Sequence, residues 1–397
     1  MKMDKEFIKQ LIDEHLRGSV FHVVGDVADD LGRECYVVGG YVRDILLERP
    51  SKDIDFVTVG SGIEVAEAVA KALGPRTSLA VFRTYGTAQV KSRDVELEFV
   101  GARRESYTRN SRNPIVEDGT LEDDQQRRDF TVNAMMQDVL SGEIIDCWGG
   151  REDLKNGVIR CVNPGTFQED ALRILRALRF AAVYGFAIEE ETAQAAHLLK
   201  STLKHVAKER ITVELSKLLC GAGAQEILLR HGAVIAEVLP AALHAEAIAQ
   251  TPAQLPIRLA HLLRDEQDVR AALGALRLDN ATAKAAAELI ALKDRPEPES
   301  AVQWRKLLYE AGQERTQQLA AWKQWNVQPL QDVLARGDCW NLKMLAVTGK
   351  DLMAAGVPKG REVGRALEAL LQAVIEEKTM NEKAALLNYI NRQEIEG

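Results

Sequence analysis

The segment Tyr36-Val-Val-Gly-Gly-Tyr-Val-Arg-Asp44 decides the fold of the first part of this chain. Residues 35–38 are short and apolar, which predicts a buried strand, and residues 42–47 predict a short helix. Gly39 and Gly40 remove two Cβ atoms where the chain turns between these elements. Backbone N–H groups can therefore approach an anion closely, and the helix N-terminus adds a partial positive charge beside it.

The same region continues into Asp53-Ile54-Asp55, at the start of a second predicted strand, residues 54–59. Arg43, on the first helical turn, has a planar guanidinium that could bind phosphate oxygens. Asp53 and Asp55 share a face because residues i and i+2 of a strand point the same way. Two adjacent carboxylates repel each other unless a cation lies between them, and Mg²⁺ accepts carboxylates, phosphates and water.

Each half of this pattern has a structural alternative. A glycine pair after a strand is usually a tight turn, and Asp-x-Asp alone is usually a solvated strand end. Their occurrence together, in the order strand, glycine turn, helix, strand, favours a site for metal-dependent nucleotide chemistry.

Composition limits what surrounds this site. The 397 residues predict two to four domains, and 46% apolar with 28% charged residues is typical of a soluble protein. Five scattered cysteines form no Cys-x-x-Cys pair, so neither a disulfide framework nor a zinc site is indicated. The net charge of −8 argues against broad nonspecific duplex binding. The N-terminus lacks an apolar signal core and no apolar run approaches 18 residues, so we expect a cytoplasmic protein without a membrane segment.

The character of the chain changes near residue 160. Before it, helical segments alternate with predicted strands at residues 86–91, 95–100 and 143–146. After it, the sequence is rich in Ala, Leu and Glu and is predicted to be helical almost throughout. A small α/β part followed by a long helical part suits an enzyme that holds an elongated substrate and works on its end.

A further acidic pair lies on the predicted strand at residues 95–100. Glu96-Leu97-Glu98 again places two carboxylates on one face. We expect Glu98 to lie beside Asp53 and Asp55 as a third catalytic carboxylate. A solvated edge strand is an equally good interpretation of the spacing alone.

A basic cluster follows at Arg127-Arg128-Asp129-Phe130-Thr131-Val132-Asn133. We interpret it as the start of a helix, with Asp129 and Asn133 one turn apart. Arg128, Asp129 and Asn133 could then bind phosphate or ribose hydroxyls. The alternative is a salt-bridge network at the surface.

A third cluster lies between Glu169 and Phe180 and is predicted to be an amphipathic helix. Arg173, Arg176 and Arg179 occupy one half of it, and Ala, Ile and Leu side chains form the core-facing half. Asp170 and Arg173 are neighbours at i,i+3, a spacing whose default is an exposed ion pair of little energy.

The same Asp170 and Arg173 can also be interpreted as a reader of nucleotide bases. A carboxylate accepts hydrogen bonds and a guanidinium donates them. Cytosine and adenine each present an amino donor beside a ring-nitrogen acceptor, whereas uracil and guanine present the reverse order. The pair would therefore accept CTP and ATP and leave unpaired polar groups with UTP and GTP.

These motifs resemble, in order, those of the class II tRNA nucleotidyltransferases, the bacterial CCA-adding enzymes of the polymerase-β-like superfamily. The resemblance covers residues 20–220 strongly and resumes from residue 347 to residue 383. Residues 225–340 match the family only in being predicted helical, without a recognisable motif. The motifs are Gly39-Gly40-x-Val42-Arg43-Asp44, Asp53-x-Asp55, Arg127-Arg128-Asp129-Phe130-Thr131-x-Asn133-Ala134, Glu169-Asp170-x-x-Arg173, and Glu209-Arg210-Ile211 with Glu214 and Leu218-Leu219.

The resemblance implies an α+β fold, with a polymerase-β-like nucleotidyltransferase head containing a small mixed sheet, followed by all-α neck, body and tail. It implies that two Mg²⁺ ions held by Asp53 and Asp55 support in-line nucleotidyl transfer to the RNA 3′-hydroxyl. The partners implied are the tRNA acceptor arm, which body and tail would grip, and CTP and ATP. The implied parts are a head at residues 1–158, a neck at 159–220, a body at 221–330 and a tail at 331–397. The nucleotide-binding residues implied are Gly39, Gly40, Arg43, Arg128, Asp129, Asn133, Asp170, Arg173, Arg176 and Arg179.

Other members of the superfamily are the alternatives. Bacterial poly(A) polymerases typically carry a Gly-Arg-Arg-Phe-x-x-x-His element, from which residues 78–86 depart. Enzymes that add only the two cytidines have a shortened loop before the Arg-Arg-Asp motif, and residues 101–124 look full length. Full CCA addition is therefore favoured, and an enzyme that adds only A stays open. A non-catalytic RNA-binding module would have no need for both Asp53 and Asp55.

Overall fold

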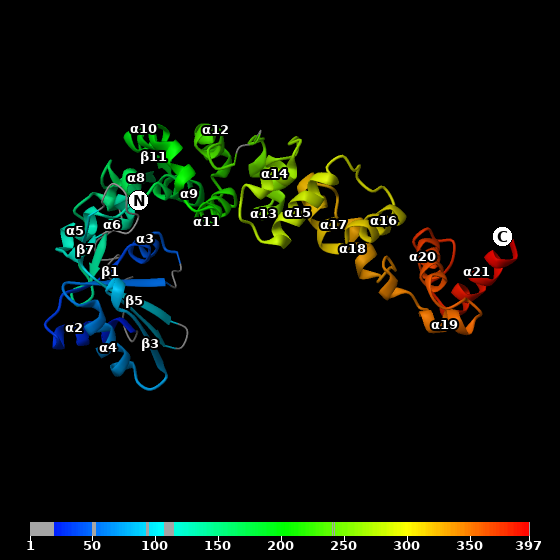
Figure 1. Cartoon of the computed structure of the whole chain (residues 1–397), viewed down its shortest axis with the longest axis horizontal. Helices are drawn as coiled ribbons and strands as arrows, with labels where there is room; N and C mark the ends of the chain where they lie inside the picture. Colours follow the sequence, from blue (N-terminus) through cyan, green and yellow to red (C-terminus); the bar gives the residue numbers. More distant parts are fainter. Residues whose placement is uncertain are drawn as a thin grey trace. The chain divides into compact units, whose positions relative to one another are not determined.

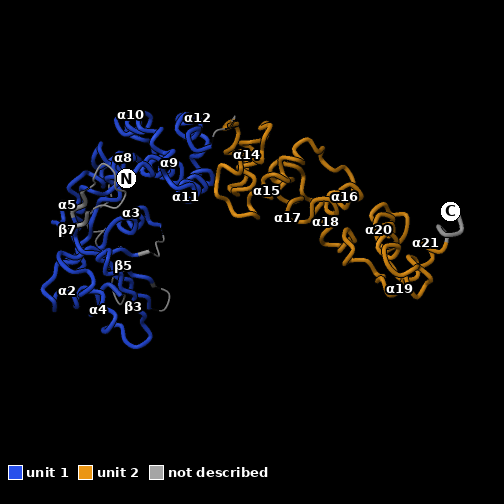
Figure 2. Tube along the Cα trace, in the orientation of Figure 1, with its two compact units in different colours: residues 1–240 blue, residues 241–397 orange. Residues whose placement is uncertain are grey.

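The computed structural model describes residues 20–49, 53–92, 95–106, 115–239, 241 and 243–396 (Figure 1). The chain divides into two compact units, residues 1–240 and residues 241–397 (Figure 2). In the described ranges, no helix has the length and apolar character needed to cross a membrane.

A mixed seven-stranded sheet forms the framework of the first unit, in the order β3-β4-β5-β2-β1-β8-β9. Strands β2 and β5 are parallel, and the other ladders of this sheet are antiparallel. The predicted strands are confirmed within one residue at each end. The strands of the sheet are β1 (Cys35–Val38), β2 (Asp53–Thr58), β3 (Thr77–Phe82), β4 (Thr87–Ser92), β5 (Val95–Gly101), β8 (Met136–Asp138) and β9 (Ile144–Ile145).

One face of this sheet is covered by α2 (Val20–Asp30) and α4 (Gly62–Leu73). Phe56 of β2 is fully buried there and stacks on Phe99 of β5, with ring centres 4.8 Å apart. Its ring centre lies 5.9 Å from that of Phe21 of α2. Helix α4 begins at Gly62, where a Cβ would lie 2.6 Å from the carbonyl carbon of Val100. The close approach of helix and strand therefore requires glycine at this position.

Shorter elements and helices complete the first unit. Two-stranded sheets pair β6 (Arg103–Ser106) with β7 (Ile115–Asp118) and β10 (Val158–Ile159) with β11 (Ala187–Ile188). The remaining helices are α3 (Gly40–Leu46), η1 (Arg83–Tyr85), α5 (Leu121–Gln126), α6 (Thr131–Ala134), α7 (Gly150–Asn156), α8 (Thr166–Glu169), α9 (Leu172–Tyr184), α10 (Glu190–Leu199), η2 (Lys200–His205), α11 (Lys208–Leu219) and α12 (Ala224–Ile235).

The amphipathic helix predicted after residue 170 is confirmed as α9. Its Ile174, Leu175 and Leu178 are fully buried, and the helix packs against α11. The chain leaves the helix at Gly185, whose φ of 71° is a left-handed conformation that glycine adopts easily. The arginine half of α9 therefore has a fixed direction within the unit.

The helix predicted to begin at Arg127 is wrong. Helix α5 ends at Gln126, and α6 does not begin until Thr131. Between them Phe130 is extended and fully buried, 5.7 Å from the ring of Phe180. Burial of this aromatic side chain in the core outweighs the helical tendency of its neighbours.

Every regular secondary-structure element in the described part of the second unit is a helix, as predicted. Trp304 of this unit is fully buried, and its ring centre lies 6.0 Å from that of Trp325. The α+β fold class is confirmed, and the division into head, neck, body and tail stays a prediction. The elements are η3 (Ile248–Gln250), α13 (Leu255–Leu262), α14 (Val269–Gly274), α15 (Asn280–Ala291), α16 (Ala301–Ala311), α17 (Gln313–Lys323), α18 (Gln328–Ala335), η4 (Leu342–Met344), α19 (Gly349–Ala354), α20 (Arg361–Ile375) and α21 (Lys383–Glu396).

Candidate active site

Acidic residues of β2 and β5 lie on the sheet face opposite α2 and α4. The register of these parallel strands pairs Asp53 with Glu96 and Asp55 with Glu98. Asp55 and Glu98 are both exposed, whereas the residues between the acidic positions are buried. The prediction that Glu98 lies beside the aspartates is therefore confirmed for Asp55. Asp53 shares this face by its place in the strand, and its side chain lies outside the described part of the structure.

The electrostatics of this pair fit a divalent cation. Partial burial and the negative charge of Asp55 raise the pKa of Glu98. A cation between the strands would relieve this repulsion, and carboxylate oxygens are the ligands that hard divalent ions prefer. Among the described side chains, no group of three potential ligands is close enough to hold a metal. Asp53, which the sequence predicts as a metal ligand together with Asp55, is not among these described side chains.

The glycine turn after β1 lies against two arginines. Gly39 has a φ of 70°, and a Cβ there would lie 3.3 Å from Nη1 of Arg128. A Cβ on Gly40 would lie 3.4 Å from Nη2 of Arg43. The missing side chains therefore leave room for two guanidinium groups beside the backbone, as the interpretation of the turn as an anion site requires.

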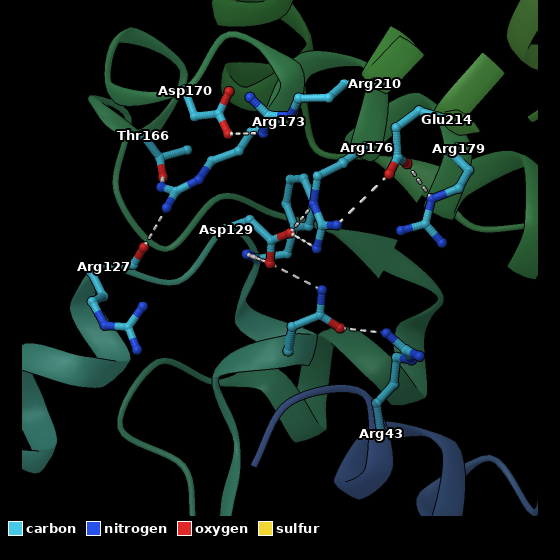
Figure 3. A network of polar contacts seen from close by, with 12 residues as sticks. Arg43, Arg127, Asp129, Thr166, Asp170, Arg173, Arg176, Arg179, Arg210 and Glu214 are labelled. Atoms are coloured by element: carbon cyan, nitrogen blue, oxygen red, sulfur yellow. Dashed lines mark hydrogen bonds and ion pairs between the residues drawn. The ribbon is translucent and has the colours of Figure 1, made fainter. Parts of the chain in front are cut away.

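A network of polar contacts links Arg43 of α3 to helix α9 (Figure 3). Nη1 of Arg43 donates to Oδ1 of Asn133 at 2.5 Å, and Nδ2 of Asn133 donates to Oδ1 of Asp129 at 3.0 Å. Arg176 donates to Oδ2 of Asp129 through Nε at 2.8 Å, with Nη2 at 2.6 Å. Asp129 is therefore the common acceptor that joins the residues after α5 to α9.

Asp129 is held in its charged form. Burial alone would raise its pKa, but Arg176 and the hydrogen bond from Asn133 outweigh burial and lower the pKa below its ordinary value. The backbone N–H of Phe130 also donates to Oδ1 at 2.9 Å. Although the predicted helix is absent, Asp129 and Asn133 are in contact as the spacing suggests.

Glu214 of α11 carries the network further. Its side chain is buried, with Oε2 accepting from Nε of Arg179 at 2.7 Å and Oε1 3.8 Å from Nη1 of Arg176. Two of the three arginines of α9 therefore share one buried carboxylate. In the sequence, Glu214 is identified only as part of a motif, and no partner is predicted for its side chain.

The i,i+3 ion pair that is the default for Asp170 and Arg173 is replaced by other contacts. Oδ2 of Asp170 accepts from Nη2 of Arg210 at 2.7 Å, and its Oδ1 accepts from the N–H of Leu172 at 3.0 Å. Asp170 therefore accepts a backbone hydrogen bond at the N-terminal end of α9, and its Oδ2 oxygen points toward α11. The default i,i+3 ion pair is therefore wrong, and the reading of the base by Asp170 and Arg173 stays a prediction.

A separate set of hydrogen bonds holds the guanidinium of Arg173 in place. It donates to the hydroxyl of Thr166, to Glu169 at 3.2 Å and, through Nη2, to the carbonyl of Arg127 at 2.8 Å. These bonds engage three of the five N–H donors of a guanidinium. Arg173 is therefore held in place and still has donors for a ligand.

Arg127 and Arg128 share a carboxylate that the sequence interpretation overlooked. Asp124 is fully buried, and both arginines donate to it, Arg128 at 2.8 Å. Burial alone would raise the pKa of Asp124, but the two arginines lower it. Its spacing of three and four residues before the arginines is the signal that could have identified it.

Aromatic rings hold the guanidinium of Arg43 from the α9 side. Its central carbon lies 5.0 Å from the ring centre of Phe180 and 4.8 Å from that of Tyr184. The hydroxyl of Tyr184 donates to Oδ1 of Asp44 at 3.0 Å, and Arg43 donates to the same oxygen at 2.9 Å. No sequence motif pointed to Tyr184, because its partners are about 140 residues away.

Three protein families match the chain, each over a separate segment. The "Poly A polymerase head domain" matches residues 35–160. The "Probable RNA and SrmB- binding site of polymerase A" matches residues 185–244, and a family described as tRNA nucleotidyltransferase domain 2 matches residues 248–390. Together the three families cover most of the chain.

Individual relatives match over different lengths. The CCA-adding enzyme of Enterococcus faecalis is 32% identical over 393 residues, which span 92% of this chain and 94% of that enzyme. The A-adding tRNA nucleotidyltransferase of Aquifex aeolicus is 46% identical over 160 residues, 40% of this chain but only 19% of that enzyme. The crystal structure of the Bacillus stearothermophilus CCA-adding enzyme in complex with CTP is similar with a TM-score of 0.76 and 31% identity, covering 94% of this chain and 96% of that one.

Proposed function

Because the chain belongs to the family of CCA-adding enzymes, we propose that it adds C, C and A in turn, from CTP and ATP, to the 3′ end of tRNA. One structural observation carries the proposal: a carboxylate pair suited to a divalent cation occurs in the same unit as a linked set of arginines. The alignment with a CCA-adding enzyme along nearly the whole chain supports the choice of reaction.

We assign the reacting groups as follows. Asp53 and Asp55 would hold Mg²⁺, which supplies a Lewis acid for the 3′-hydroxyl and charge neutralisation for the phosphates. The O3′ oxygen bonds to the α-phosphorus, and the bond from that phosphorus to the bridging oxygen of pyrophosphate breaks. Glu98, beside Asp55 and with a raised pKa, takes the proton of the hydroxyl.

The glycine turn and the arginines beside it would bind the triphosphate. Gly39 and Gly40 allow close approach, and Arg43 and Arg128 lie against them as donors. Asn133 orients Arg43 from the other side. Asp129, Arg176 and Arg179 complete the nucleotide site by fixing the polar half of α9.

Asp170 and Arg173 would select the base. Asp170 accepts a hydrogen bond from the amino group of cytosine or adenine, and a remaining N–H of Arg173 donates to the ring nitrogen. Arg210 holds Asp170, so that the two reading groups come from fixed positions at the start of α9. Uracil and guanine would oppose donor to donor and acceptor to acceptor at these groups.

We also assign residues 221–330 and 331–397 as body and tail that hold the acceptor arm of tRNA, and we place the activity in the cytoplasm. The family matches over residues 185–244 and 248–390 support this assignment of the helical part.

An enzyme that adds only A is the second candidate, because the relative with 46% identity over 160 residues is an A-adding enzyme. Poly(A) polymerase is the third, on the description of the family that matches residues 35–160. The three candidates differ in the RNA end that they extend and in the nucleotide that they use.

The test supplies Mg²⁺ and labelled CTP or ATP with tRNA that ends either at the discriminator base or after CC. Addition of C, C and A to the shorter tRNA is expected. Addition of A only to tRNA ending in CC would identify an A-adding enzyme, and long A-tails would identify a poly(A) polymerase. Absence of any incorporation would leave a non-catalytic RNA-binding protein.

Asp55→Asn is the matched variant for this test, with Asp30→Asn at the exposed end of α2 as its control. The first change should lower transfer by about 10²–10³-fold because it removes a charge at the reacting centre. The second should leave transfer unchanged. Binding of tRNA should be retained by both variants, and equal activity of the two would contradict the assignment of the carboxylates.

A further inference from the structure

Strand β3 forms one edge of the large sheet and exposes aromatic side chains at its end. Phe82, its last residue, is 48% exposed, and Tyr85 on the following turn η1 is 68% exposed. Arg83 between them is also exposed. Large apolar groups gathered at the surface typically mark a contact site.

The strand register places Phe82 on the face that carries the catalytic carboxylates. Asp55 pairs with Glu98, Glu98 with Gln89 and Gln89 with Ala80. Directly paired residues point to the same face, and Phe82 follows Ala80 by two residues, so it shares that face. Three strand spacings and two residues along the strand place Phe82 about 16 Å from Asp55.

The geometry of the reaction places the RNA on this side of the sheet. In-line transfer requires the attacking and leaving oxygens on opposite sides of the phosphorus. The glycine turn and Arg43, which would hold the leaving phosphates, follow β1 on one side of β2. The attacking 3′ end therefore approaches over β5, β4 and β3.

We propose that Phe82 and Tyr85, with Arg83 between them, form a stacking platform for the unpaired nucleotides that precede the 3′ end of the RNA. Aromatic rings stack on any base, and an arginine beside them contacts the phosphates, a combination that binds single strands without sequence preference. A stacked strand rises about 3.4 Å per nucleotide, so the distance of about 16 Å between Phe82 and Asp55 spans at most about five nucleotides. The proposal rests on the proposed function, because it takes Asp55 as the reacting centre.

The length of the single strand gives the proposal a specific consequence. A tRNA that ends after CC has three unpaired nucleotides, whereas one that ends at the discriminator base has one. The platform should therefore contribute more to binding of the longer end. A second copy of the chain pairing along the β3 edge is the other occupant that an exposed edge strand can take.

The experiment compares Phe82→Ala and Tyr85→Ala with the ring-keeping changes Phe82→Tyr and Tyr85→Phe. Leu79→Ala is the matched control, because Leu79 is a 38% exposed apolar residue of the same strand on the opposite face. The KM for tRNA ending in CC, with ATP as the nucleotide, should rise about five- to tenfold in the alanine variants. The KM for ATP and kcat should not change, the ring-keeping variants should resemble the parent, and tRNA ending at the discriminator should show a smaller rise.

A second measurement separates this proposal from the proposed function. A short RNA with 2-aminopurine near its 3′ end should lose fluorescence on binding to the full chain without nucleotide, and less so with Phe82→Ala. If the parent protein incorporates no nucleotide, the proposed function fails while the stacking measurement still stands. The platform is overturned if Phe82→Ala changes neither the KM nor the fluorescence, if Leu79→Ala has the same effect, or if the effects follow a change from dimer to monomer.

Discussion

Replacing Asp129 by asparagine is the strongest test of the network that connects the phosphate site to α9. The substitution keeps the shape of the side chain and the oxygen that accepts from Phe130 and Asn133. It replaces the oxygen that faces Arg176 by an amide group, so that donors oppose donors. The charge that balances Arg176 is lost at the same time.

The structure sets the size of the effect. Asp129 is 7% exposed, and breaking a buried ion pair by removing one partner costs about 3–5 kcal/mol of unfolding free energy. The side chain of Arg176 is 34% exposed and Glu214 lies 3.8 Å away, so the lower end, about 3 kcal/mol, is expected. With a urea dependence of at most about 3 kcal/mol per molar, the midpoint should fall by at least about 1 M.

The assay must report the first unit alone, because the two units can unfold separately. Four of the five tryptophans lie in the second unit, so intrinsic fluorescence is unsuitable. Cys35, 1% exposed in β1, becomes reactive when the first unit unfolds. Its alkylation across a urea series, measured by mass spectrometry of the Cys35 peptide, gives the required midpoint.

Asp138→Asn is the matched control in the same unit. A single oxygen of Asp138, Oδ1, accepts from the N–H groups of Leu140 and Ser141 at 3.0 and 2.6 Å, a role that the amide oxygen of asparagine also performs. Its effect should be within about 0.5 kcal/mol. A midpoint for Asp129→Asn no lower than that of the control would refute the reasoning.

The pH dependence gives an independent check on the same substitution. The folded pKa of Asp129 is lowered, so its contribution to stability is present above the unfolded pKa of about 3.9 and is lost as the pH falls below it. The difference between the parent and the Asn variant should therefore narrow below about pH 4. A constant difference down to pH 3 would contradict a charged Asp129.

Three further changes test individual assignments. Asp170→Ala should relax the choice of base, raising UTP use relative to CTP about tenfold or more in competition assays, and unchanged selection would remove Asp170 from base reading. Tyr184→Phe, which loses a hydrogen bond to Asp44, should raise the KM for nucleotide about three- to tenfold, and Tyr184→Leu, which also loses the ring beside Arg43, should raise it further. Because the pKa of Glu98 is raised, activity at limiting Mg²⁺ should fall on acidification at a higher pH than an ordinary glutamate allows, and Glu98→Gln should remove this part of the pH profile.

Local patterns predicted much of the fold and part of the site. The strand, glycine turn, helix and strand around Gly39 follow from residue sizes and short-range spacing, and β1 has the predicted bounds. The shared face of Asp53 and Asp55 follows from the two-residue period of a strand. The buried half of α9 follows from the helical period in the same way.

Tertiary packing decided what the periods could not. Arg43 meets Asn133 across 90 residues, and Arg210 meets Asp170 across 40 residues, so neither contact is encoded in local spacing. Burial of Phe130 interrupts the helix that its neighbours favour, and so places Asp129 between Asn133 and Arg176. The sequence by itself determined the residue types and the faces on which they lie. Only the three-dimensional structure determined the partners, because a polar or charged side chain pairs with whichever donor or acceptor the fold brings into hydrogen-bonding distance.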